Sequence, residues 1–262
     1  FEPDVAIKVI DAMAEVGMNV LVVDIADGVK YKSHPELERF YSADMESLRQ
    51  VCDHAHARDI DVVPKLNFSK SGRNRHDEWM QPHASPLVFT WTLDRYWDVA
   101  ADLIKELVEV CRPETFFHIG MDEDHSRSLD QFVDAIERLR GVVLKQGLKT
   151  MIWSDAAHDS MDEIAQVHAQ KCKAAEPLLS TDITQVLWHY RKHSPDDVAR
   201  LRQRGFDVWA APGQTAALVA AWKEAVEKHR GNGLLMTQWL KCSEENETAM
   251  LKLIRELGAD YF

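Results

Sequence analysis

The sequence lacks the cysteine patterns that hold small secreted domains or zinc modules together. Only four of its 262 residues are cysteines, and no Cys-x-x-Cys pair occurs. Neither a disulfide framework nor a zinc knuckle is therefore predicted. Long apolar runs are also missing, so we expect no membrane-spanning segment and no membrane partner. The sequence contains no Gly-x-Gly-x-x-Gly or Walker A motif either, which argues against a nucleotide-binding loop.

Positive charge is scarce. The chain carries 31 Lys and Arg against 43 Asp and Glu, which gives a formal net charge of −12 at pH 7. A phosphate backbone would be repelled over most of such a surface, so nucleic acid is not an expected partner. Hydrophobic residues make up 45% and charged residues 28%, which is typical of a globular protein with a sizeable core. We expect one domain over residues 1–262.

The first residue is Phe1 rather than methionine. We therefore expect the chain to belong to a longer protein, and its compartment stays unknown because targeting signals cannot be judged from this sequence.

Short apolar runs alternate with segments of helical apolar spacing. The runs predict seven strands, at residues 19–25, 61–66, 115–119, 150–153, 183–188, 206–211 and 234–239. The helical spacing predicts eight helices, at residues 5–16, 45–57, 97–110, 129–144, 161–172, 195–204, 216–229 and 244–257. Such alternation indicates parallel strands joined by crossover helices. Eight helices without a glycine-rich phosphate loop favour a (β/α)₈ TIM-type barrel over a doubly wound sheet.

A complete barrel has a strand before its first helix, so we expect the first strand to lie upstream of Phe1 or to be replaced. A helix precedes every predicted strand, so residues 19–25 are predicted to form the second barrel strand. An open seam would expose two strand edges and invite pairing with another chain, which leaves an oligomer possible. The segment 69–92, after the third barrel strand, is too long for an ordinary connection, and we expect it to cover an active site.

Two adjacent carboxylates follow the strand at residues 115–119. The run His118-Ile119-Gly120-Met121-Asp122-Glu123 ends a hydrophobic strand in a glycine and then delivers Asp122 and Glu123. Catalytic groups of barrel enzymes lie at this end of the strands. Two nearby carboxyls resist joint ionisation, so one of them can act as a general acid near neutral pH. The alternative is that residues 122–124 simply cap the next helix.

Three tryptophans also fall at predicted strand ends, namely Trp153, Trp188 and Trp239. Flat aromatic rings stack on the C–H faces of sugars, so three on one rim favour a sugar site over simple packing. Asp155, close to Trp153, could hydrogen-bond a sugar.

The carboxylate run resembles the His-x-Gly-Gly-Asp-Glu signature of glycoside hydrolase family 20, the β-N-acetylhexosaminidases. The similarity extends along most of the chain, to residues 9–13, 18–21, Asp27, Val63, Pro64 and 233–239. The resemblance implies a TIM-barrel glycosidase that uses neither a cofactor nor a metal and whose partner is an amino-sugar glycoside.

The implied mechanism is substrate-assisted retaining hydrolysis of a terminal N-acetylhexosamine, in which the substrate's acetamido oxygen attacks the anomeric carbon. Asp122 would stabilise the resulting oxazolinium ion. Glu123 would protonate the leaving oxygen and then activate water. The three tryptophans would wall the sugar pocket, and Asp27 would bind a hydroxyl or the Asp-Glu pair. We place Asn67, His118 and Asp155 among the substrate-binding residues as well.

Departures from the family pattern fall mainly on groups that recognise hydroxyls. Met121 stands where the second glycine is usual, and the strand that carries a hydroxyl-binding arginine is absent. Lys65-Leu66-Asn67-Phe68 replaces an acidic residue followed by Pro-Gly-His, Leu240-Lys241 replaces Thr-Glu, and residues 210–213 offer no counterpart of the usual tyrosine. Substrate specificity, and whether activity is retained, are therefore more open than the acid chemistry.

Two other functions remain compatible with the residues. A metal-dependent sugar isomerase or hydrolase would draw its ligands from His118, Asp122, Glu123, Asp155, His158 and His189. A degenerate barrel would bind carbohydrate without catalysis. Bound metal would favour the first alternative, and sugar binding without turnover would favour the second.

Overall fold

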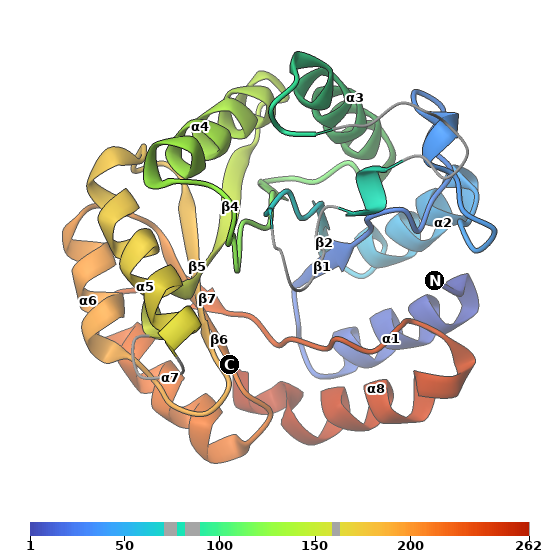
Figure 1. Ribbon diagram of the computed structural model, residues 1–262. Helices are drawn as coiled ribbons and strands as arrows, with labels where there is room; N and C mark the ends of the chain where they lie inside the picture. Colours follow the sequence, from blue (N-terminus) through green and yellow to red (C-terminus); the bar gives the residue numbers. More distant parts are fainter. Residues whose placement is uncertain (71–77, 82–89, 159–162, 262) are drawn as a thin grey trace.

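The protein is a parallel α/β barrel that is open on one side (Figure 1). The computed structural model describes residues 1–70, 78–81, 90–158 and 163–261. Within these ranges seven parallel strands form one sheet in the order of the chain, and helices cover its outer face (Figure 1). The strands are β1 (Val20–Asp24), β2 (Asp61–Lys65), β3 (Phe116–His118), β4 (Lys149–Ser154), β5 (Thr184–His189), β6 (Val208–Pro212) and β7 (Gly233–Leu234).

Eight α-helices surround the strands in the described part of the chain. They are α1 (Pro3–Glu15), α2 (Met45–His56), α3 (Asp94–Cys111), α4 (Leu129–Lys145), α5 (Glu163–Ala175), α6 (Pro195–Gln203), α7 (Ala216–Lys228) and α8 (Glu244–Leu257). The predicted TIM-type architecture without its first strand is confirmed. None of these helices is long and apolar enough to span a bilayer. All four cysteines are free thiols.

The last strand is shorter than predicted. The sequence pattern placed a strand at residues 234–239, whereas β7 ends at Leu234. The Leu235 amide still donates to Ala210 on β6 at 2.8 Å. β7 pairs with β6 on one side and, among the described residues, with no strand on the other, and the chain then leaves the sheet before it reaches Trp239.

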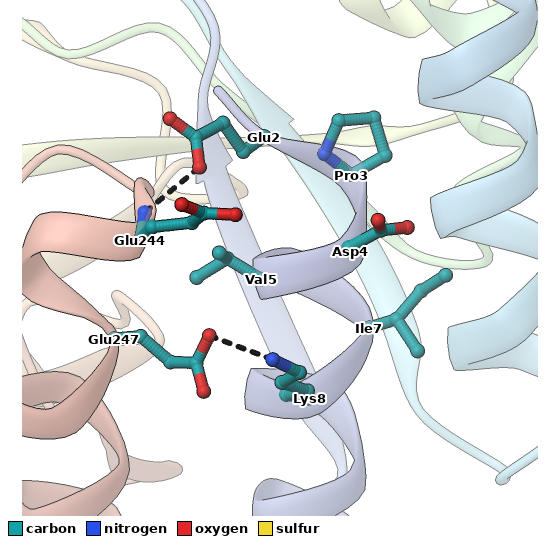
Figure 2. Close-up of a pocket in the computed structure, with 8 residues that line it drawn as sticks. All are labelled: Glu2, Pro3, Asp4, Val5, Ile7, Lys8, Glu244 and Glu247. Atoms are coloured by element: carbon teal, nitrogen blue, oxygen red, sulfur yellow. Dashed lines mark hydrogen bonds and ion pairs between the residues drawn. The ribbon is translucent and has the colours of Figure 1, made fainter.

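Two helices pack against each other beside the open side of the barrel. Among the described residues β1 and β7 do not pair, and α1 packs against α8 beside the gap (Figure 1). The Glu2 carboxylate accepts the Glu244 amide at 2.8 Å, and the Lys8 ammonium pairs with Glu247 at 2.8 Å (Figure 2). Four of the eight residues that line the pocket between these helix ends are acidic, and the others are Pro3, Val5, Ile7 and Lys8 (Figure 2).

The core has two layers, as the alternation of strand side chains requires. The larger layer fills the space between the sheet and the helices. A smaller cluster inside the barrel contains Met151, Trp153, Val186, Ala211 and Leu235. This inner cluster fills the barrel beneath the ends of the strands where the candidate site lies.

Most of the long segment after β2 lies outside the described residues, including 71–77 and 82–89. Its expected role as a cover for the site therefore stays a prediction. In the part that is described, Trp79 is buried, and its indole N–H donates to the Asn67 carbonyl at 3.2 Å.

Candidate active site

A strained turn carries the two candidate catalytic carboxylates beyond the end of β3. Gly120, Met121 and Glu123 all have positive φ angles, of 74°, 80° and 50°. Only glycine adopts such angles without steric cost, so Met121 and Glu123 are held there by their surroundings. Backbone strain of this kind persists where tertiary contacts impose it and often accompanies a functional site.

Asn67 positions Asp122 and the turn together. Its side-chain amide donates to the Asp122 carboxylate at 2.7 Å, and its side-chain carbonyl oxygen accepts the Met121 amide at 3.1 Å. A side chain at Gly120 would lie only 2.6 Å from the Asn67 Cα atom, so the close approach requires glycine. The sequence analysis assigned Asn67 to the substrate, and in this structure its contacts serve Asp122.

Asp155 is a buried residue that accepts a hydrogen bond from the backbone of Glu123. It lies in the short 3₁₀ turn after β4 and is only 1% exposed. One carboxyl oxygen accepts the Glu123 amide at 2.7 Å, and the other accepts the Trp188 indole N–H at 2.8 Å. Burial, and then the nearby Asp122 carboxylate, raise the pKa of Asp155 to about 8. A side chain so buried offers almost no surface for the direct sugar contact predicted for it.

Aromatic side chains line the region beside these carboxyls. The Trp153 and Trp239 ring centroids lie 6.0 Å apart, and Trp188 lies 5.3 Å from Tyr190. The Trp239 indole N–H donates to the Tyr190 hydroxyl at 2.9 Å, so this tyrosine joins the predicted tryptophans into one wall. Trp239 is 55% exposed, whereas Trp153 is buried and lies at the base of the wall.

Sequence reasoning missed Tyr190. A tyrosine was sought at residues 210–213, after β6, whereas Tyr190 directly follows β5. Its position two residues after Trp188 was the available signal, because alternate residues near a strand end tend to share a face.

His118 lies inside the barrel rather than on its rim. The side chain is fully buried, its Nδ1 accepts the Gly120 amide at 3.0 Å, and its ring packs 4.7 Å from that of Trp153. Burial, followed by the charge of Lys65, holds its pKa well below the usual value, which favours the neutral ring. The sequence analysis placed His118 among the substrate-binding residues. In the structure its hydrogen bond instead holds the turn at Gly120.

Lys65 is a further interior group. Its ammonium pairs with Asp24 at 2.6 Å and lies 5.8 Å from the centroid of the Trp239 ring. The pair links β1 and β2 at the same level as His118, because Lys65 is in register with both Asp24 and His118.

Asp27 lies in a separate set of contacts. Its carboxylate accepts the Arg39 guanidinium and the Tyr41 hydroxyl, each at 2.9 Å. The alternative that Asp27 binds the Asp122 and Glu123 pair is not observed among its hydrogen bonds. Asp27 holds the loop after β1, and its binding of a sugar hydroxyl stays a prediction.

The capping alternative for residues 122–124 is wrong. Helix α4 is capped by Ser128, which forms a reciprocal capping box with Gln131. Asp124 instead forms a fully buried ion pair with Arg127 at 2.6 Å and accepts the Lys70 amide at 2.7 Å. Asp122 and Glu123 therefore do not cap α4.

The proposed metal ligands are not gathered at one point. His158 and His189 lie close, with ring centroids 5.2 Å apart, and His158 Nε2 contacts the Trp188 carbonyl at 2.8 Å. Across the ranges that the structure describes, no three His, Cys, Asp or Glu side chains are arranged to hold a metal ion. The geometry therefore gives the metal-dependent alternative no support.

The chain matches known proteins in its fold but not in its sequence. No family model matches the chain, and no curated protein matches it by sequence. Solved structures do match. The N-acetyl-β-hexosaminidase of Streptomyces plicatus has a TM-score of 0.61 at 18% identity, over 81% of this chain and 45% of that one.

Two further structures match the whole chain. The Flavobacterium johnsoniae chitobiase has a TM-score of 0.65 at 16% identity, and the match covers 50% of its length. Dispersin B has a TM-score of 0.64 at 16% identity, and 94% of its length is covered. The chain thus spans about half the length of the Streptomyces and Flavobacterium enzymes. These likenesses show the fold, which is a divergent form of the glycoside hydrolase family 20 barrel.

Proposed function

We propose that this protein is a glycoside hydrolase that removes a terminal N-acetylhexosamine by substrate-assisted retaining hydrolysis. The main support is the pair Asp122 and Glu123 at the end of β3. Asn67 holds the side chain of Asp122 at 2.7 Å, and Asp155 holds the backbone of Glu123 at 2.7 Å. A family 20 likeness at 15–19% identity adds the fold but does not by itself carry the activity.

The two carboxyls take different parts in this proposal. Asp122 stabilises the positive charge that develops as the acetamido oxygen attacks the anomeric carbon and an oxazolinium ion forms. Glu123 donates a proton to the leaving glycosidic oxygen and then removes one from the water that opens the oxazolinium. A carboxylate placed where positive charge develops stabilises the transition state more than the ground state.

The aromatic wall supplies the sugar platform. Trp239 and Tyr190 are joined by a hydrogen bond, and Trp188 packs beside Tyr190. Rings fixed in this way present flat apolar faces to the C–H groups of a sugar at little entropic cost. Amino-sugar glycosides fit both the carboxylates and the wall.

The direct test is hydrolysis of aryl N-acetyl-β-glucosaminides and N-acetyl-β-galactosaminides by the native protein and by Glu123→Gln. We expect the native protein to cleave at least one of them and the variant to be about 10²–10⁴-fold slower. An aryl β-glucoside, which lacks the acetamido group, should not be cleaved. Glu227→Gln, on the exposed side of α7, serves as a matched control and should keep native activity.

Absence of turnover by the native protein would overturn the enzymatic proposal. If tryptophan fluorescence then shows that the protein binds N-acetylglucosamine, the protein would be the non-catalytic carbohydrate-binding barrel instead.

A further inference from the structure

Asp155 connects three parts of the candidate site. It follows β4, accepts the Glu123 amide from the turn after β3, and accepts the Trp188 indole from β5. Each of its two oxygens therefore serves a different neighbour. At 1% exposure the side chain is buried and offers almost no surface to a ligand.

The hydrogen bond to Glu123 acts on a backbone that is unfavourable by itself. Glu123 has a φ of 50°, in the left-handed region that non-glycine residues rarely adopt. A buried acceptor for its amide helps to hold that conformation, because an unpaired buried N–H would carry the full desolvation cost. The direction in which the Glu123 carboxyl leaves the chain thus depends on Asp155.

The second hydrogen bond acts on the aromatic wall. Trp188 is further packed by the His158 ring, whose centroid lies 3.8 Å away, and by Tyr190. These packing contacts restrict where the Trp188 ring can lie, while the hydrogen bond from its N–H to Asp155 fixes the rotation of the ring. The acid and the wall are therefore oriented by the same carboxyl group.

The electrostatic surroundings favour the neutral form of this carboxyl. Asp122 and Glu123 face it from the turn after β3, Cys172 faces it from α5, and Trp188 from β5 is uncharged. His158, in the same 3₁₀ turn, is itself held neutral by burial and by His189, which lower its pKa to about 4. The cations nearest to this group are Lys171, which acts on Cys172, and Lys192, which acts on His158. The contacts that favour the ionised form of Asp155 are the hydrogen bonds from the Glu123 amide and the Trp188 indole.

We propose that Asp155 is a positioning residue, which orients the Glu123 backbone through one oxygen and the Trp188 indole through the other. This inference rests on the proposed function, because it takes Glu123 as the acid and Trp188 as part of the sugar wall. Groups that hold a catalytic side chain matter because a misplacement of about 1 Å can cost roughly 10²-fold in rate.

The first readout does not require activity. The indole N–H resonance of Trp188, assigned by its loss in Trp188→Phe, should titrate near pH 8 in the native protein, as its partner ionises. In Asp155→Asn that titration should vanish. A native Trp188 resonance that does not respond to pH, or a titration that persists in Asp155→Asn, would overturn the inference even if the protein hydrolyses glycosides.

The second readout is kinetic. Asp155→Asn, which keeps one acceptor oxygen, should lower kcat about 10–100-fold with a smaller change in KM, and Asp155→Ala should be slower still. Asp196→Asn, an exposed carboxyl of α6, should behave as the native protein. Native kcat in Asp155→Asn would refute the positioning role. Trp188→Phe removes the hydrogen bond between the indole and Asp155 without altering Asp155. This variant therefore still tests the contact with Trp188 if an Asp155 variant fails to fold.

The two proposals fail in different ways. A native protein that cleaves no aryl N-acetylhexosaminide refutes the proposed function, whereas an active native protein with an active Asp155→Asn variant refutes only the role of Asp155.

Discussion

Replacing Gly120 with alanine should destabilise the protein and disturb the candidate site at the same time. Gly120 has a φ of 74°, and an added Cβ would lie 2.2 Å from the Asn67 side-chain oxygen and 2.6 Å from its Cα atom. The side-chain oxygen could rotate away, but only by giving up the bonds that hold Met121 and Asp122. The backbone of Asn67 has no such freedom, so a rotamer change cannot relieve the second clash.

The expected magnitude has two parts. An alanine in the left-handed region costs about 1 kcal/mol. Forcing a methyl group into a packed site costs roughly 1–3 kcal/mol more, because neighbours must shift. The free energy of unfolding should therefore fall by about 2–4 kcal/mol.

Gly147 provides a matched control for backbone strain alone. Its φ is 79°, close to that of Gly120, but no atom lies within 4 Å of the position a Cβ would take. Gly147→Ala should lower the free energy of unfolding by only about 1 kcal/mol. Its aryl-glycosidase activity should be native, whereas that of Gly120→Ala should fall.

Urea unfolding followed by circular dichroism measures both variants under the same conditions. Equal destabilisation of the two would mean that the close approach of Gly120 to Asn67 has no energetic consequence. Native activity in Gly120→Ala would show that Asn67 does not position Asp122.

Three further outcomes are expected. Arg127→Met should lower the free energy of unfolding by about 1.5–3 kcal/mol in the same urea assay, because the buried Asp124 carboxylate loses its charged hydrogen bond to the guanidinium and keeps only the Lys171 ammonium at 3.3 Å as a cationic partner; a loss below about 1 kcal/mol would contradict this. The buried rings of His158 and His168 have pKa values lowered to about 4 from 6.5, so the unfolded chain binds their protons first, and stability measured against pH should decline as the pH falls from 6.5 to about 4. A flat stability profile over that range would refute the assignment. Tyr190→Phe removes the acceptor of the Trp239 indole, worth about 1 kcal/mol net, and should raise KM roughly fivefold with little change in kcat; an unchanged KM would exclude Tyr190 from the sugar wall.

The sequence was a good guide to the barrel because its elements are specified locally. The spacing of apolar residues along a segment shows which face of that helix or strand is buried, so each element can be predicted from its own stretch of sequence. The seven strands and eight helices were therefore expected near their observed bounds. Residues 235–239 were the exception, because a strand at the edge of an open sheet ends where pairing ends, and that depends on a missing neighbour rather than on local pattern.

The candidate site was predictable in its outline. A hydrophobic strand that ends in Gly120 and leads to Asp122 and Glu123 is visible in the sequence, and parallel strands bring such ends to one rim. Tryptophans at strand ends could be found in the same way. The roles of the surrounding polar groups could not, because hydrogen-bond partners come from strands far apart in the chain.

The sequence by itself determined the alternation of elements, the parallel barrel and the position of the carboxylate pair, since each follows from short-range patterns of burial. Only the tertiary structure decided that Asn67 serves Asp122, that Asp155 lies buried between Glu123 and Trp188, and that Asp27 belongs to a different set of contacts. The physical reason is that burial and hydrogen bonding depend on distances between segments, and curling the sheet into a barrel is what sets those distances.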